Sequence, residues 1–140
     1  MDSIDKFVDI KYKLKSSDNF EEYLKFIGVG LISRKTACAV TPVSVVSKNE
    51  DGSYTFTMAT TFRTVKFTFR IGEEFIEERP DGVKIKSLME VDGDSLIQTQ
   101  TEDCGRKSKH VRSFTPESLT VITTAEGWDG KCVRTYEAIP

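Results

Sequence analysis

Most of the chain alternates apolar and polar residues with a period of two, which is typical of β-strands that bury one face. From Pro42 onward the alternation recurs in short segments separated by turn residues, at a spacing of about eight to twelve residues. Several of these turns place Gly beside Asp, and both residue types tolerate the positive φ of tight hairpins. With one earlier segment, the pattern predicts ten strands, at Phe7–Leu14, Val43–Ser47, Ser53–Met58, Thr64–Ile71, Phe75–Glu78, Val83–Val91, Ser95–Thr101, Lys107–Phe114, Ser118–Thr124 and Lys131–Ala138.

Two short segments near the N-terminus follow a helical period instead. The first is predicted at Ser17–Phe26, where apolar residues recur at the i, i+3, i+4 positions of Phe20, Tyr23 and Leu24. The polar residues at its start are of the types that accept hydrogen bonds from the amides of a first helical turn. The second helix is predicted at Leu31–Val40 and ends before a proline.

The order of these elements predicts an all-β fold. Ten short antiparallel strands in a meander expose two sheet edges unless the sheet closes, so a barrel is favoured. We therefore expect a ten-stranded antiparallel up-and-down β-barrel, capped by the helix-turn-helix at about residues 17–40, in a single domain spanning 1–140. Because barrel diameter grows with strand number, ten strands should leave room inside for a ligand.

Charge and composition exclude several function classes. The chain has 20 Lys and Arg against 22 Asp and Glu, so it lacks the broad basic surface that retains nucleic acid. We see no signal peptide and no apolar stretch long enough to span a membrane. The three cysteines are far apart and lack CxxC spacing, which indicates reduced thiols and no zinc site. These features predict a cytoplasmic protein with no metal and no cofactor.

Alternation in two late strands places cationic side chains on the predicted inner face. If Lys131 and Glu137 meet water, Arg134 and Tyr136 must point inward. In Lys107–Phe114, Arg112 shares a face with Ser108, His110 and Phe114, and the same question arises. A buried Arg is costly unless an anion pairs with it. The two arginines therefore predict either a site for a ligand carboxylate or a structural ion pair with an interior Asp or Glu.

Several segments, in order along essentially the whole chain, resemble the signature of the intracellular fatty-acid-binding proteins, a branch of the calycin/lipocalin-like superfamily. They are Asn19-Phe-Glu-Glu-Tyr-Leu-Lys-Phe-Ile-Gly-Val-Gly-Leu-Ile-Ser-Arg-Lys35, Thr61-Phe-Arg63, Phe69-Arg-Ile-Gly-Glu-Glu-Phe75 and Arg134-Thr-Tyr136. Members of that family form a ten-stranded barrel capped by two helices. The chain departs from the family pattern at Tyr12, where a Trp is usual, and at Val83, where an Arg is usual.

The resemblance implies a site and a function. Arg134 and Tyr136 would hold the ligand carboxylate directly, and Arg112 would assist. Further residues would lie along the acyl chain or at the portal through which it enters, namely Phe20, Tyr23, Val29, Ser33, Ala37, Phe62, Asp81 and Gln100. The implied function is intracellular binding and transport of long-chain fatty acids, without catalysis, by a monomer that contacts membranes transiently through its helical cap.

Other functions stay open at this point. A related carrier would hold another hydrophobic acid, such as a retinoid or a bile acid. A small hydrolase using His110 and Cys104 is a remote alternative, because the sequence contains no nucleophile elbow or oxyanion-forming glycine loop. His110 is also able to hydrogen-bond a ligand near Arg112, or to titrate near neutrality and modulate binding.

Overall fold

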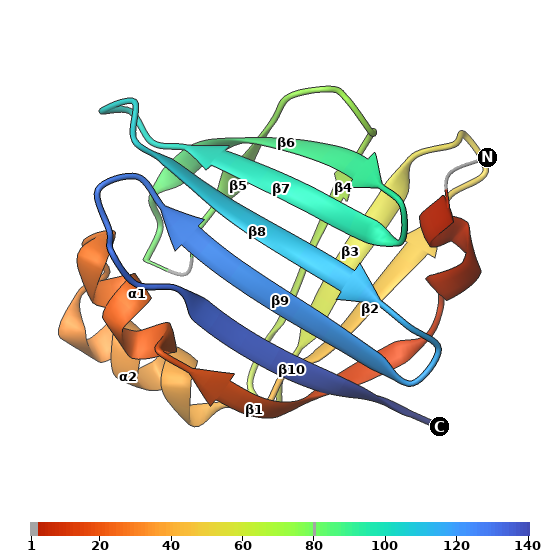
Figure 1. The fold of residues 1–140 in the computed structure, drawn as a ribbon, viewed down its shortest axis with the longest axis horizontal. Helices are drawn as coiled ribbons and strands as arrows, with labels where there is room; N and C mark the ends of the chain where they lie inside the picture. Colours follow the sequence, from red (N-terminus) through yellow and green to blue (C-terminus); the bar gives the residue numbers. More distant parts are fainter. Residues whose placement is uncertain (1–2, 80) are drawn as a thin grey trace.

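Ten antiparallel strands form one sheet that rolls into a barrel in the computed structural model, which describes residues 3–79 and 81–140 (Figure 1). The strand order is β4-β3-β2-β1-β10-β9-β8-β7-β6-β5. The predicted all-β barrel is therefore confirmed. The strands are β1 (Lys11–Asp18), β2 (Val43–Lys48), β3 (Tyr54–Ala59), β4 (Thr64–Phe69), β5 (Phe75–Glu78), β6 (Lys84–Asp92), β7 (Ser95–Thr101), β8 (Lys107–Phe114), β9 (Ser118–Ala125) and β10 (Cys132–Ile139).

Helices occupy both ends of the barrel. The helices α1 (Phe20–Phe26) and α2 (Leu31–Ala39) cover one end, as predicted for the cap. A 3₁₀-helix, η1 (Ser3–Phe7), lies at the opposite end, where Lys6 pairs with Asp94 of the turn between β6 and β7 at 3.0 Å (Figure 1). The predicted strand Phe7–Leu14 is wrong in its first half, because η1 ends at Phe7 and β1 starts at Lys11.

The start of α1 also differs from the prediction. Ser17 and Asp18 belong to β1, where they pair with Arg134 and Val133 of β10. The helix begins only after Asn19, whose backbone is left-handed (φ 66°) and whose side chain makes no capping hydrogen bond. Cross-strand pairing with β10 therefore overrides the local capping preference of these polar residues, after a bulge in β1 shifts its register.

The sheet does not close completely through backbone hydrogen bonds. β4 and β5 are the two ends of the strand order and do not pair, so the expectation that closure removes both edges is wrong. The turn between β4 and β5 is attached to β6 instead, because the Gly72 N–H donates to the Met89 carbonyl at 2.8 Å. Aromatic rings bridge the gap instead, with the ring centroid of Phe75 5.4 Å from that of Phe67 and 6.2 Å from that of Phe69.

The main core fills the end of the barrel next to η1. Phe7 of η1 stacks on Phe114 of β8 at 5.5 Å between ring centroids. Tyr12 is 1% exposed, and its hydroxyl donates to the Thr115 carbonyl at 2.8 Å. Tyr12 therefore packs in this core with its hydroxyl satisfied. A second, smaller core lies under the helices and contains Tyr23, Leu24, Ile27, Val29 and Cys132.

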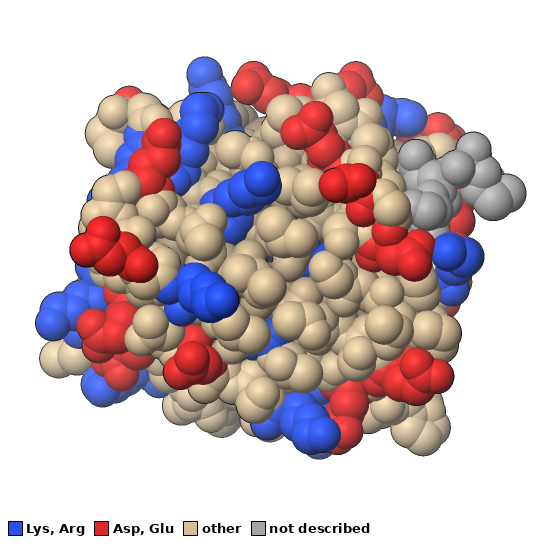
Figure 2. All heavy atoms as spheres, viewed as in Figure 1, with Lys and Arg blue, Asp and Glu red and all other residues tan. Residues whose placement is uncertain are grey.

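The outer face of β8, β9 and β10 carries few charges. Figure 2 shows this face from the outside, with its middle largely uncharged and both signs of charge around its edges. Outward residues of the three strands pair in register, with Val111 beside Ile122 and Ile122 beside Val133. This face offers no continuous basic patch for phosphate groups.

No helix within residues 3–79 and 81–140 is long and apolar enough to span a bilayer.

Candidate functional site

Strand register brings the two predicted arginines onto one row of the inner face. Arg112 of β8 and Arg134 of β10 both pair with Val121 of β9, one from each side. Because neighbouring strands are roughly 4.8 Å apart, the two Cα atoms are separated by about 10 Å. Tyr136 follows Arg134 by two residues and so points inward as well, where it is 3% exposed. The predicted inward orientation of all three residues is confirmed.

Both guanidinium groups are buried, and neither has an ionic partner among the described residues. Arg112 and Arg134 are each 8% exposed. Nη1 of Arg112 and both Nε and Nη1 of Arg134 have no hydrogen-bond partner within the described residues. Among the described residues, no carboxylate oxygen lies within 4.0 Å of either guanidinium, the distance limit for an ion pair. The alternative of a structural ion pair with an interior Asp or Glu is therefore not realised in the described residues. Burial lowers the pKa of the Arg112 guanidinium.

Aromatic rings support the two cations instead. The Cζ atom of Arg134 lies 3.7 Å from the ring centroid of Phe20, the first residue of α1. The Cζ atom of Arg112 lies 4.9 Å from the ring centroid of Phe56 in β3, on the other side of the barrel. Cation–π contacts stabilise a charge but leave its N–H groups free to donate. Each guanidinium is thus held in position and keeps hydrogen-bonding capacity for an anion.

A pocket of about 390 Å³ opens between the helical cap and the inner face of β1 and β10. Its volume is within the range of small-molecule sites, roughly 300–1,000 Å³. It is lined by Leu14, Ser17, Asn19, Phe20, Glu21, Glu22, Cys38 and Arg134. Glu21 is already paired with Lys35, at 2.9 Å between the charged atoms. The pocket therefore connects the cap to the guanidinium of Arg134.

The other residues predicted along the acyl chain lie in three places. Tyr23 and Val29 are each 3% exposed and belong to the small core under the helices, against which Ala37 packs. Ser33 is half-buried on α2. Phe62 is 86% exposed in the turn between β3 and β4. The structure thus brings Phe20 to the arginine cluster, while these five residues are spread over the cap and its surroundings.

A polar network on the inner face includes Gln100 and a residue that sequence reasoning missed, Glu77 of β5. One carboxylate oxygen of Glu77 accepts hydrogen bonds from Ser87, Gln98 and Gln100, the last at 2.8 Å. The signal was present in the sequence, since Glu77 shares parity with Phe75. We call the inward polar residues of β5 to β10 the polar wall; they are Glu77, Ser87, Gln98, Gln100, Ser108, His110, Arg112, Thr123, Arg134 and Tyr136.

His110 is part of the polar wall and does not titrate near neutrality, contrary to one expectation. Its Nε2 lies 2.7 Å from Oε1 of Gln100, and its Nδ1 lies 2.7 Å from the Thr123 hydroxyl. Burial, with a smaller contribution from the charge of Arg112, lowers the pKa of His110 to about 3. Both ring nitrogens are therefore occupied by neutral partners. Cys104, its proposed partner in a hydrolase, is a free and exposed thiol.

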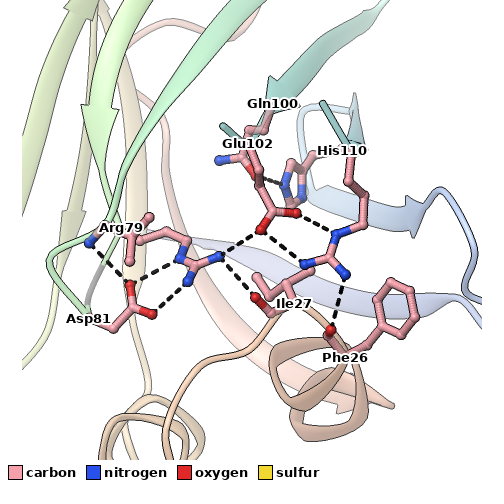
Figure 3. A network of polar contacts seen from close by, with 9 residues as sticks. Phe26, Ile27, Arg79, Asp81, Gln100, Glu102 and His110 are labelled. Atoms are coloured by element: carbon pink, nitrogen blue, oxygen red, sulfur yellow. Dashed lines mark hydrogen bonds and ion pairs between the residues drawn. The ribbon is translucent and has the colours of Figure 1, made fainter. Parts of the chain in front are cut away.

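Asp81, the remaining predicted portal residue, belongs to a cluster that ties two turns to α1 (Figure 3). Arg79 binds Asp81 through two hydrogen bonds, of 3.0 and 2.6 Å, and donates to the Ile27 carbonyl at 3.3 Å. Glu102 lies 3.6 Å from Arg79 and binds Arg106 at 2.5 and 2.9 Å. We call the four charged residues of this cluster, Arg79, Asp81, Glu102 and Arg106, the cap latch.

The cap latch has a clear structural role. Arg106 also donates to the Phe26 carbonyl at 3.4 Å, and its guanidinium lies 4.9 Å from the Phe26 ring centroid. The two arginines thereby satisfy carbonyls at the C-terminal end of α1, where the helix dipole favours cations. Asp81 thus holds Arg79 in place.

Within the described residues, no group of three or more potential metal ligands is found.

Comparisons with known proteins agree with this architecture. The model of the lipocalin / cytosolic fatty-acid binding protein family matches residues 11–138. The muscle fatty acid-binding protein of Schistocerca gregaria is 40% identical over 96% of this chain and 98% of its own length. The crystal structure of a fatty acid-binding protein from brain tissue of Drosophila melanogaster is 42% identical, with a TM-score of 0.86 over 94% of this chain and 99% of the other. A Schistosoma mansoni fatty acid binding protein in complex with arachidonic acid is 29% identical, with a TM-score of 0.88 over 99% of both chains.

Proposed function

Because this chain belongs to the lipocalin / cytosolic fatty-acid binding protein family, we propose that it binds one long-chain fatty acid inside the barrel and transports it in the cytosol. Arg134 and Tyr136 bind the carboxylate directly, and Arg112 assists. The acyl chain runs from this cluster past Phe20 towards the cap. This assignment treats the protein as a carrier, without a catalytic step.

The observation that carries the proposal is the pair of buried, unpaired guanidinium groups. Arg112 and Arg134 each keep at least one buried N–H nitrogen without a partner in the described residues. A buried charge without a partner destabilises the fold: removing one partner of a buried ion pair typically lowers the free energy of unfolding by about 3–5 kcal/mol. A ligand carboxylate would supply the missing acceptor oxygens, because a guanidinium matches the geometry of a carboxylate.

Chain burial and head-group recognition have different roles in this proposal. Burying a sixteen-carbon chain removes about fifteen CH₂ and CH₃ groups from water at ~0.8 kcal/mol each, an upper limit of order 10 kcal/mol before ordering costs. The carboxylate contact mainly offsets the desolvation of the charges involved. The chain therefore sets total affinity, and the arginine cluster selects acids over other head groups.

The test compares palmitic acid with hexadecanol in calorimetric titrations of delipidated protein. Arg134→Gln is expected to lower affinity for the acid at least tenfold and to change affinity for the alcohol less than threefold. Arg70→Gln is the matched control, since Arg70 lies at the surface paired with Asp51 at 2.9 Å. Equal losses for acid and alcohol in Arg134→Gln would refute the head-group assignment. Tighter binding of retinoic acid or a bile acid than of palmitic acid would shift the ligand class.

We also propose that the helical cap contacts membranes when the ligand is transferred. Large apolar side chains are exposed on α2, where Leu31 is 58% and Ile32 is 83% exposed, and Phe62 in the turn between β3 and β4 is 86% exposed. Helix α2 contains two basic residues and no acidic residue, which favours anionic lipid surfaces.

Transfer of a fluorescent fatty acid to vesicles tests this contact. The rate should rise when the vesicles contain phosphatidylserine and fall several-fold in Ile32→Asp, whereas Ile76→Asp, at a residue 59% exposed on β5, should leave it unchanged. Rates independent of vesicle charge and of Ile32 would refute the contact.

Light scattering should give the 15.8 kDa mass of a monomer.

A further inference from the structure

The charges inside the barrel can be counted from strand register and ion pairs. At the end near η1, Lys48 pairs with Asp5 at 2.6 Å. At the helical end, the cap latch contains two cations and two anions and is neutral. Between these ends, the described strands direct three charged residues inward: Arg112, Arg134 and Glu77. The middle of the barrel therefore carries a net charge of one positive unit, and Glu77 is the residue that reduces it from two.

Hydrogen bonds hold the carboxylate of Glu77 on the inner face. It is half-buried, while its neighbours Ile76 and Glu78 are exposed on the outer face of β5. Three donors, from Ser87, Gln98 and Gln100, converge on its Oε1 atom. All three groups are donors, so they fix the position of this carboxylate on the inner face.

The same hydrogen bonds give the polar wall a direction. Gln100 turns its amide nitrogen to Glu77. Its amide oxygen therefore faces His110, a contact drawn in Figure 3. Nε2 of His110 must then carry the proton, and Nδ1 accepts from the Thr123 hydroxyl. The chain from Thr123 through His110 and Gln100 to Glu77 is thus neutral except at its end. His110 adds no positive charge that would cancel the anion.

Glu77 faces the arginine row without blocking it. Gln98, which donates to Glu77, pairs with His110, and the adjacent inward position on β7, Leu96, pairs with Arg112. Glu77 and Arg112 are not within ion-pair distance, so the guanidinium stays available to a ligand. The attraction between the two charges acts across the interior, where the low dielectric weakens it less than water does.

We propose that Glu77 determines head-group specificity: it sets the interior charge to match one monovalent carboxylate and disfavours lipids with a doubly charged head group. This inference rests on the proposed function of the arginine cluster. A carboxylate brings the middle of the barrel to neutrality, whereas a phosphate dianion leaves an excess negative charge near Glu77. Because repulsion between two negative charges acts across this low-dielectric interior, removing the charge of Glu77 should strengthen binding of a monoanion roughly tenfold.

The experiment uses dodecanoic acid, dodecanol and dodecyl phosphate with the delipidated full chain at pH 8, where the phosphate is mainly a dianion because its second pKa is about 6. Glu77→Gln keeps an acceptor oxygen for the three donors and removes the charge. It is expected to bind the acid roughly tenfold more tightly and the phosphate more strongly still, with the alcohol unchanged. Glu78→Gln, on the outer face, should match the wild type for all three ligands. No gain in acid binding relative to alcohol in Glu77→Gln would overturn the proposal.

A measurement on the wild type keeps the proposal testable if Glu77→Gln fails to fold. Dodecyl phosphate should bind at least fivefold more tightly at pH 5, where it is a monoanion, than at pH 8, while dodecanol binds equally at both. Equal or tighter binding of the dianion would overturn the proposal. If the wild type instead does not distinguish dodecanoic acid from dodecanol, the proposed carboxylate site fails, and the two failures are therefore distinguishable.

Discussion

The two sides of the barrel interior are built from different chemistry. Inward positions of β3, β4 and β5 form an aromatic wall, made of Tyr54, Phe56, Phe67, Phe69 and Phe75, whose rings stack on one another. The polar wall opposite it is held by hydrogen bonds and contains the two arginines. Both walls meet at β5, where Phe75 and Glu77 are adjacent inward residues. The aromatic wall contributes packing energy, and the polar wall contributes selectivity.

This division explains why the barrel remains stable with an unpaired gap and two buried cations. The rings of the aromatic wall bridge β4 and β5, where backbone hydrogen bonds are absent. They also supply the face of Phe56 to Arg112. Changes in the aromatic wall should therefore affect folding more than ligand choice, and changes in the polar wall should do the reverse.

The largest effect is expected from Phe69→Ala. Phe69 is 2% exposed and contacts the rings of Tyr54, Phe67 and Phe75. Truncating a buried Phe costs about 3–5 kcal/mol, because packing is lost and a cavity remains. Urea denaturation measures this loss, and the ratio of acid to alcohol affinity should stay unchanged in protein that is still folded. A loss below about 1 kcal/mol would contradict the role of the aromatic wall. Phe62→Ala, at an exposed residue, is the control and should change stability by less than about 0.5 kcal/mol.

An intermediate effect is expected from pH, through His110. Its folded pKa of about 3 lies below the unfolded value of about 6.5, so the unfolded state binds the proton between these values. The stability contribution is complete above pH 6.5 and is lost as pH falls, by up to about 1.4 kcal/mol per pH unit. Unfolding of the wild type and His110→Gln from pH 7 to pH 5 should differ in slope accordingly. Parallel curves, or a histidine NMR signal that titrates near pH 6.5 in the folded state, would contradict it.

The smallest effect is expected from Glu102→Gln in the cap latch. Its side chain is 17% exposed and joins Arg79 to Arg106, so its charge is partly screened by solvent and the loss should be about 1 kcal/mol. Amide hydrogen exchange should increase in α1 and in the turn containing Asp81, and remain unchanged in β9. Glu90→Gln, at an exposed position on β6, is the control. Equal exchange in α1 for both variants would mean that the cap latch does not hold the helix.

Much of the fold and part of the site follow from the sequence. Period-two alternation predicted the strands and indicated an inward Arg134 and Tyr136, because register and side-chain direction are coupled in a sheet. It succeeded where the outer face is clearly charged, as at Lys131 and Glu137. Strand parity therefore predicts the burial of Arg134 once its charged neighbours are placed in water, whereas the burial of Arg112 is seen only in the structure.

The misses have physical reasons. Ser17 and Asp18 look like helix caps, but pairing with β10 outweighs that local preference, and pairing partners are distant in sequence. Glu77 was overlooked because acidic residues at 73, 74, 77 and 78 hide the alternation of β5. The cap latch joins turns to α1 through residues such as Arg79 and Arg106, and only the folded chain brings these turns together.

The most direct test of the carboxylate site is the ionisation of the bound head group. Fatty acid labelled with ¹³C at the carboxyl carbon, bound to the wild type, should give an NMR signal of the ionised form at every pH from 8 to 4. Buried guanidinium groups lower the pKa of a neighbouring carboxyl group, which otherwise lies near 4–5. A bound signal that titrates with this ordinary midpoint, and that Arg134→Gln leaves unchanged, would contradict the account.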